Sequence, residues 1–193
     1  MKRICVYCGS STGNHPEYAD AARQLARLLA ERGIEIVYGA GNVGIMGVLA
    51  DAMLEAGGRI IGVIPGALMD LELGHSGLTE MHVVESMHDR KAMMEELSDG
   101  FIALPGGFGT FEEILEVTTW AQLGMHEKPC ALLNVEGYYD NLIAMLDRAV
   151  ADEFLKPIFR SMIMVDNDPV KILERFDSYE PPHVRKWITE NAT

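Results

Sequence analysis

Short apolar runs rich in β-branched residues alternate along the whole chain with longer amphipathic stretches. The runs predict strands over residues 3–8, 34–38, 59–64, 81–84, 101–104, 130–134 and 162–165. The stretches between them predict helices near residues 16–31, 44–56, 86–98, 110–124, 138–151 and 168–176. Alternating strands and helices are typical of βαβ units on a parallel sheet. The pattern therefore predicts an α/β fold with a Rossmann-like, doubly wound parallel sheet.

The length of 193 residues fits a single domain with a full hydrophobic core. Hydrophobic residues make up 48% of the chain and charged residues 23%, which is typical of a globular protein rather than a disordered one. We expect the folded domain to cover residues 1–180. A C-terminal tail, residues 181–193, begins at Pro181 and Pro182.

The formal net charge of −13 argues against a nucleic-acid partner, because phosphate binding normally leaves a basic footprint. One local cluster of donors can still hold a small anion in an acidic protein. Apolar stretches fall short of the ~18 residues that a membrane-spanning helix needs, and the first residues lack the pattern of a signal peptide. The three cysteines, an odd number, do not form a closed disulfide framework. These features predict a cytoplasmic protein without a membrane partner.

Three loops that follow predicted strands are rich in glycine or small polar residues. They are GSSTGN at 9–14, GAGNVGIMG at 39–47 and PGGFGTFEE at 105–113. Parallel sheets bind ligands at the carboxyl ends of their strands, where such loops gather. The sequence therefore predicts a ligand site built from these loops.

Residues 39–44 match the G-x-G-x-x-G pattern of dinucleotide-binding loops. Glycines there let backbone N–H groups approach an anion at the start of a helix. However, the loop follows the second predicted strand, and Ile64-Pro65-Gly66 stands where an acidic residue would hold a ribose. An NAD-dependent oxidoreductase is therefore disfavoured, and a tight turn without a ligand is a further alternative.

The loop at 105–113 carries a sharper signal. Thr110 is a candidate N-cap with Glu113 three residues later, so one interpretation is that Glu113 only completes a capping box. On an ideal helix, however, Glu113 lies closer to the predicted buried stripe than Glu112 or Glu116. A carboxylate in the first turn, beside three glycines, would face the region where a ligand binds.

Ser86 and Asp89 have the spacing of another capping box and predict the start of a helix. Arg90 projects into the apolar face of that helix, where a guanidinium is costly unless it is paired or bound to an anion. Lys91, about a quarter-turn away, can be solvated. Arg90 is therefore expected either to form a structural salt bridge or to grip a phosphate or carboxylate.

The cysteines and histidines do not predict a metal site. Cys5 and Cys8 have C-x-x-C spacing, but within a strand their thiols point to opposite faces and lack partners for zinc, so core thiols are expected. The histidines also lack metal-ligand spacing.

The Arg90-Lys91 pair followed by PGGFGTFEE resembles the LONELY GUY family, also labelled the "lysine decarboxylase-like" family. The marker of that family is P-G-G-x-G-T-x-x-E preceded by an Arg-Lys pair. The similarity runs from CVYCGSS through GNVGIMG and SMHDRK to TWAQLGMHEKP and LLNVEGYYDNL.

The resemblance implies a Rossmann-like phosphoribohydrolase that forms a homodimer or a higher homo-oligomer. Such enzymes release the free base from cytokinin nucleoside 5′-monophosphates, and often from AMP, leaving ribose 5-phosphate. By motif position Arg90 and Glu113 would be catalytic, and the loop from Gly106 to Thr110 would bind phosphate. It also places Glu72 and Thr118 at or near the substrate. Together with the glycine-rich loops, the predicted substrate-binding residues are Gly9, Ser10, Gly41, Asn42, Gly44, Glu72, Lys91, Gly106, Gly107, Phe108, Gly109, Thr110, Phe111, Glu112 and Thr118.

The chemistry of these residues agrees with that activity. Cleavage of a ribose–base bond passes through an oxocarbenium-like state, which a carboxylate such as Glu113 stabilises while it orients water. This mechanism requires no metal, NAD or pyridoxal phosphate. Phe108 replaces a tyrosine common in plant members and leaves the preferred base open. A non-catalytic carrier of a nucleotide or of molybdenum cofactor is the alternative, because related folds bind these without hydrolysis.

Overall fold

The computed structural model describes residues 1–69 and 74–182. Its centre is a seven-stranded sheet in the order β4-β3-β2-β1-β5-β6-β7, and each strand pairs in parallel with its neighbours. The strands are β1 (Arg3–Tyr7), β2 (Glu35–Tyr38), β3 (Ile60–Pro65), β4 (Glu80–Val84), β5 (Gly100–Ala103), β6 (Cys130–Leu133) and β7 (Ile163–Asp166). The predicted parallel sheet is confirmed, and each strand lies within about one residue of its predicted bounds.

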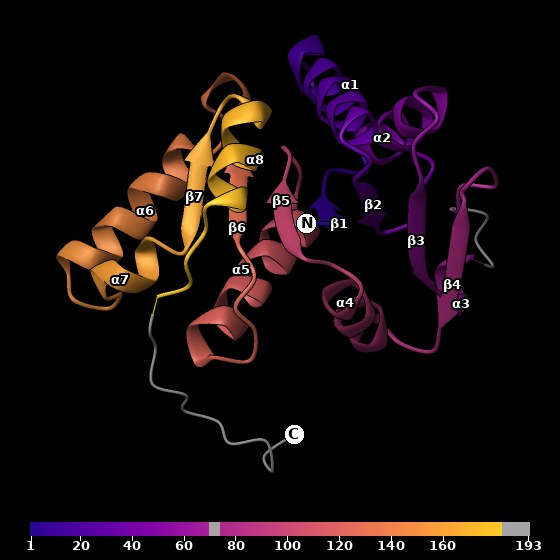
Figure 1. Ribbon diagram of the computed structural model, residues 1–193. Helices are drawn as coiled ribbons and strands as arrows, with labels where there is room; N and C mark the ends of the chain where they lie inside the picture. The colour runs from indigo at the N-terminus through magenta and orange to yellow at the C-terminus, as the bar shows by residue number, and fades with distance from the viewer. Residues whose placement is uncertain (70–73, 183–193) are drawn as a thin grey trace.

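Helices cover both faces of the sheet, as Figure 1 shows. One face packs against α1 (Pro16–Glu31), α2 (Gly44–Glu55) and α8 (Pro169–Asp177). The other packs against α4 (Met87–Glu96), α5 (Phe108–Leu123) and α6 (Asp140–Ala151). Three short elements were not predicted, namely α3 (Gly66–Met69), the 3-10 turn η1 (Val135–Gly137) and α7 (Pro157–Arg160).

Side chains along β1 alternate between two buried clusters, one on each face of the sheet. Ile4 and Val6 belong to the cluster under α1 and α2, whereas Cys5 belongs to the cluster under α4 and α5. This is the two-residue period of a strand. Cys8 lies in the first cluster, so the two thiols of the C-x-x-C pattern are on opposite faces. Both are free and buried, as predicted.

The order in which the chain adds strands to the sheet reverses beside β1. Strands β1 to β4 proceed outward in sequence order, and the chain then returns to place β5 on the other edge of β1. Ligands in open α/β sheets bind at such a reversal, outside the carboxyl ends of the strands. The loops after β1 and β5 meet there, because the Gly9 N–H donates to the Pro105 carbonyl at 3.1 Å.

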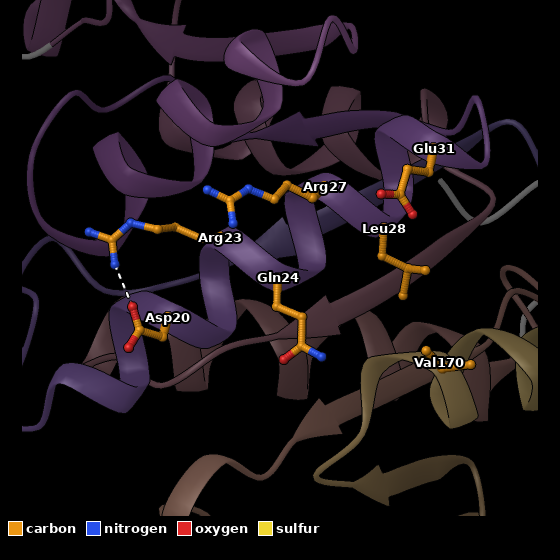
Figure 2. A pocket seen from close by; sticks show the side chains of 7 residues that line it. All are labelled: Asp20, Arg23, Gln24, Arg27, Leu28, Glu31 and Val170. Carbon is orange, nitrogen blue, oxygen red and sulfur yellow. Dashed lines mark hydrogen bonds and ion pairs between the residues drawn. The ribbon is translucent and has the colours of Figure 1, made fainter.

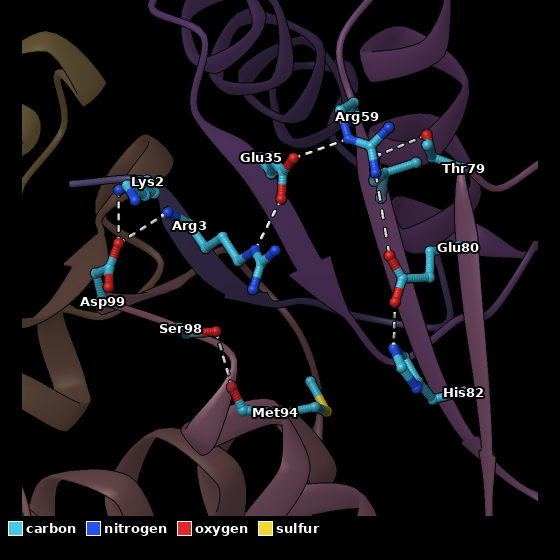
Figure 3. A network of polar contacts seen from close by, with 11 residues as sticks. Lys2, Arg3, Glu35, Arg59, Thr79, Glu80, His82, Met94, Ser98 and Asp99 are labelled. Atoms are coloured by element: carbon cyan, nitrogen blue, oxygen red, sulfur yellow. Dashed lines mark hydrogen bonds and ion pairs between the residues drawn. The ribbon is translucent and has the colours of Figure 1, made fainter.

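At the amino ends of the strands, opposite the loops just described, paired charges connect neighbouring strands, as Figure 3 shows. Glu35 accepts hydrogen bonds from Arg3 at 2.7 Å and from Arg59 at 2.8 Å. The hydrogen bond from Arg3 is the main reason that the pKa of Glu35 is lowered. Asp99 accepts from the backbone amides of Lys2 and Arg3. The charges at these ends therefore join strands to one another.

Two sequence expectations concern the ends and the hydrophobicity of the chain. Most of the predicted tail, residues 183–193, lies outside the described residues. Within residues 1–69 and 74–182, every helix is too short or too polar to cross a bilayer.

Candidate active site

A pocket of about 300 Å³ opens where the loops after β1 and β5 meet. It lies at the reversal of the strand order, as expected for a Rossmann-like sheet. Its lining residues are Gly9, Ser10, Ser11, Thr12, Gly13, Tyr18, Pro105, Gly106, Gly107 and Tyr138. The structure thus brings together Gly9 and Ser10 with Gly106 and Gly107, which were predicted from two separate loops. Sequence reasoning did not single out the two tyrosines.

Helix α5 begins earlier than predicted. Its N-cap is Gly107 and its first residue is Phe108, so Thr110 lies inside the first turn. The predicted capping box between Thr110 and Glu113 is therefore wrong, and with it the interpretation that Glu113 only caps the helix. The Thr110 side chain packs against Gly106 instead, where an added Cβ would lie 2.1 Å from the Thr110 hydroxyl oxygen.

The start of α5 presents backbone amides. Gly107 has no side chain to cap them, and the first amides of a helix have no acceptor within the helix itself. Gly107 and Gly109 are exposed, and the Phe108 side chain is 93% exposed. Together with the positive end of the helix dipole, these amides form a place where an anion can bind.

Arg90 and Glu113 form an ion pair between helices α4 and α5. The Arg90 Nη2 and Glu113 Oε1 atoms are 3.1 Å apart, and the two side chains are only 13% and 10% exposed. Burial raises the pKa of Glu113, and the charge of Arg90 opposes that rise without cancelling it. The two predicted catalytic residues are therefore in contact, although neither is among the residues that line the pocket.

Backbone groups of neighbouring strands shape the space around the Arg90 guanidinium. Its Nε atom donates to the Val63 carbonyl of β3 at 3.2 Å. Gly39, which follows β2, leaves room for the Nη2 end of the guanidinium, because a Cβ on Gly39 would lie 2.0 Å from Nη2. Neither Gly39 nor Val63 was predicted. The only sequence signal was the glycine directly after a strand.

We expect Gly39→Ala to displace Arg90 from Glu113, because the new methyl group would occupy the space of the guanidinium. A displacement of this size can cost about 10²-fold in kcat/KM. Release of free base from AMP measures the activity, and thermal unfolding measures the stability. Gly66→Ala is the matched control, since a Cβ at Gly66 has its nearest neighbour at an ordinary 3.8 Å. Equal activity of the two variants would contradict the prediction.

Lys91 is buried and doubly paired, so the expectation that it is solvated is wrong. Its Nζ atom lies 2.5 Å from Glu112 Oε1 and 2.9 Å from Glu116 Oε1. Burial lowers the pKa of Lys91, but hydrogen bonds to the two glutamates outweigh this and raise the pKa overall. The Arg90-Lys91 pair of α4 thus faces three acidic residues of α5.

The glycine loop at 39–44 packs against the loop after β1. The amides of Ile45 and Met46, which open α2, donate to the Gly9 carbonyl at 3.0 and 3.3 Å. Gly44 has a φ of +61°, and a Cβ there would lie 2.3 Å from the carbonyl carbon of Ser10. Two of the amides that could have held an anion at α2 are therefore already bonded.

The remaining residues of this loop have separate contacts. Gly41 is buried and its carbonyl accepts from the Tyr38 hydroxyl at 3.2 Å, whereas Asn42 is exposed. These contacts hold the shape of the loop.

The last predicted substrate residues occupy different places. Phe111 is half-buried and stacks on Tyr138 with ring centroids 6.3 Å apart. Thr118 donates to the Ile114 carbonyl of its own helix at 2.7 Å. The structure does not bring Thr118 to the pocket. Glu72 lies outside the described residues.

A second, open groove of about 470 Å³ runs along α1, as Figure 2 shows. Its lining residues are Asp20, Arg23, Gln24, Arg27, Leu28, Glu31 and Val170. Arg23 is paired with Asp20 at 2.7 Å, and none of the predicted site residues lies in this groove.

For residues 1–69 and 74–182, no group of three or more His, Cys, Asp or Glu side chains is placed to hold a metal ion.

Comparisons with known proteins agree with the motif. A family model described as "Possible lysine decarboxylase" matches residues 46–176. A cytokinin riboside 5′-monophosphate phosphoribohydrolase of Arabidopsis thaliana is 46% identical over 100% of this chain and 92% of its own. A probable enzyme of the same name from Oryza sativa subsp. japonica is 49% identical over 95% of this chain and 73% of its own. The chain belongs to the LONELY GUY family.

Solved structures place this LONELY GUY chain among Rossmann-like folds. The molybdenum cofactor binding protein from Rippkaea orientalis superposes with a TM-score of 0.70 at 22% identity, covering 92% of this chain and 97% of that one. The molybdenum cofactor carrier protein of Chlamydomonas reinhardtii gives 0.69 at 19% identity, covering 92% and 99%. Identities this low establish the fold alone. The predicted fold class is thereby confirmed.

Proposed function

We propose that this chain is a phosphoribohydrolase that cleaves the N-glycosidic bond of purine or cytokinin nucleoside 5′-monophosphates. Its products would be the free base and ribose 5-phosphate. The observation that carries the proposal is the buried Arg90–Glu113 ion pair, held one helical turn inside the open, glycine-rich start of α5. The names of the plant relatives, at 46% and 49% identity, support the same reaction.

The spacing along α5 would place the phosphate and Glu113 on the same side of the helix. A 5′-phosphate bound by the amides near Gly107 and Gly109 would be held by hydrogen bonds and by the helix dipole. Glu113 follows Gly109 by four residues, so the two lie on one face of the helix, about 6 Å apart along its axis. A ribose anchored by its phosphate would therefore extend toward Glu113.

The reaction we propose breaks the bond between C1′ and the base nitrogen, and the electron pair leaves with the base. Water adds its oxygen to C1′, and one of its protons is lost and ultimately balances the charge on the base. Glu113 would stabilise the positive charge on the sugar ring and accept that proton, a role that its raised pKa favours. Arg90 would keep Glu113 ionised and oriented.

A base-release assay tests the proposal directly. We expect purified protein to convert AMP and isopentenyladenosine monophosphate into free base and ribose 5-phosphate in equal amounts, measured by chromatography. The ratio of the two kcat/KM values gives the preferred base. Adenosine, which lacks the phosphate, should be a poor substrate. Nucleotide binding without any base release would instead support a carrier of a nucleotide or of molybdenum cofactor.

The assembly and the compartment are part of the same proposal. We infer a homodimer in the cytoplasm, acting on a small nucleotide without a metal or organic cofactor, and a folded domain that covers residues 1–180. The three free, buried cysteines support a reducing compartment. The net charge of −13 argues against a nucleic-acid partner. Light scattering of the purified protein measures the proposed dimer.

A further inference from the structure

Four consecutive carbonyl groups before α5 each accept a hydrogen bond from the protein. Leu104 accepts from the Tyr139 hydroxyl at 2.6 Å, and Pro105 accepts from the Gly9 amide at 3.1 Å. The Gly106 carbonyl accepts from the Tyr138 hydroxyl. The next carbonyl, of Gly107, accepts from the Phe111 amide at 3.1 Å. Two of the four donors are neighbouring tyrosines from the turn after β6.

The bond from Tyr138 fixes the peptide that is otherwise the easiest to rotate. This peptide joins Gly106 to Gly107, and glycines accept a wide range of backbone angles. In a planar trans peptide the N–H points away from the C=O, so holding the Gly106 carbonyl at Tyr138 directs the Gly107 amide away from Tyr138. If the peptide were flipped, its carbonyl oxygen would replace the amide and would repel an anion.

The turn that carries the tyrosines is firmly held. The Asn134 side chain accepts from the Tyr139 amide at 2.7 Å and donates to Asp140 at 2.8 Å. The Tyr138 ring packs edge-on against Tyr18 and Tyr139, with centroids 5.7 and 5.1 Å apart. Tyr139 is only 1% exposed. The Tyr138 hydroxyl is thus presented to the Gly106 carbonyl from a fixed position.

We propose that Tyr138 is a positioning residue, which sets the orientation of the Gly106–Gly107 peptide so that the pocket offers an amide to the phosphate of the substrate. Tyr139 assists by holding the end of β5 through the Leu104 carbonyl. This inference rests on the proposed function, because it concerns how the 5′-monophosphate is anchored. Both tyrosines lie outside the motif at residues 105–113, in the segment LLNVEGYYDNL, to which the sequence analysis assigned no role.

The first test is Tyr138→Phe, which removes the hydroxyl and retains the ring. We expect the Kd for ribose 5-phosphate, measured by calorimetry, and the KM for AMP each to rise about tenfold, the effect of one lost hydrogen bond of the stronger kind. The kcat should change far less, and the melting temperature should stay close to that of the wild type. Tyr179→Phe is the matched control, because it also removes one tyrosine hydroxyl, and Tyr179 follows α8 on the face of the sheet opposite Tyr138. An unchanged Kd in Tyr138→Phe would overturn the proposal.

The second test uses the wild-type chain and does not depend on a folded variant. In a titration with ribose 5-phosphate followed by NMR, the Gly107 amide resonance should move among the most. A Gly107 resonance that stays still while other resonances respond would overturn the role of Tyr138. If the wild-type protein neither binds ribose 5-phosphate nor releases base, both the proposed function and this inference are wrong. If the wild-type protein is active but the Gly107 resonance does not respond, only this inference is wrong.

Discussion

Glu113→Gln is expected to lower kcat/KM for AMP by about 10³-fold while the protein remains folded. The substitution keeps the shape of the side chain but removes the negative charge that would face the sugar in the transition state. The amide can still accept a hydrogen bond from Arg90, so the contact between α4 and α5 is largely retained. The base-release assay measures the loss of activity, and circular dichroism measures the fold.

The stability of Glu113→Gln follows from the direction of the pKa shift. Burial raises the pKa of Glu113 above its value in the unfolded chain. The protonated carboxyl therefore stabilises the fold below the unfolded pKa, and this contribution is lost as the pH rises through the folded pKa. Glutamine is neutral throughout, so it removes the cost of burying the carboxylate, and this gain offsets part of the cost of leaving the Arg90 guanidinium without its charged partner. At pH 8 the variant should therefore lose less stability than Arg90→Ala. Glu96→Gln, on the exposed surface of α4, is the control. Retained turnover in Glu113→Gln would remove Glu113 from the mechanism.

Arg90→Ala should produce the second large effect, a loss of about 10²-fold in kcat/KM near neutral pH. The charge of Arg90 lowers the pKa of Glu113, so its removal lets that pKa rise further. The acid limb of the pH–rate profile should therefore move to higher pH, and part of the lost activity should return as the pH is raised. The profile of kcat/KM between pH 5 and 9 measures this shift.

The stability of Arg90→Ala separates the two interpretations of this residue. Removing one partner of a buried ion pair costs about 3 kcal/mol when the other remains charged. Here the cost should be larger at pH 8 than at pH 5, because Glu113 can take up a proton at the lower pH. Arg90→Lys restores the charge without the fork of the guanidinium and should recover stability more than activity. A variant that loses stability but keeps the wild-type pH–rate profile would make Arg90 a purely structural residue.

The five inner strands could be predicted because they are buried on both faces and are therefore nearly continuous apolar runs, whereas the edge strand β4 is partly exposed. The strand order could not, because no local pattern states that β5 pairs with β1. The short helix α7 and the turn η1 were missed, since four or fewer residues carry no usable periodicity.

The candidate site was predicted where the residue type itself carries the chemistry. The contact of Arg90 with Glu113 follows from a costly guanidinium on an apolar face and a carboxylate near a buried stripe. Thr110 was misassigned because capping-box spacing does not fix which of several small residues starts the helix. Lys91 was misassigned because its partners, Glu112 and Glu116, come from a helix distant in sequence. Tyr138 and Tyr139 received no role, although the segment LLNVEGYYDNL is part of the resemblance, because the sequence does not show which carbonyl a tyrosine hydroxyl bonds.

The central place of β1 has a consequence for how the protein folds as it is synthesised. One edge of β1 pairs with β2, and the other edge pairs with β5, which is synthesised much later. Arg3 and Asp99, which are hydrogen-bonded beside this strand pair, are 96 residues apart in the sequence. A nascent chain of about half the final length therefore exposes an unpaired strand edge, a template for association between chains. We expect this long-range closure to slow folding, and the pocket between the loops after β1 and β5 is complete only when Tyr138 has left the ribosome.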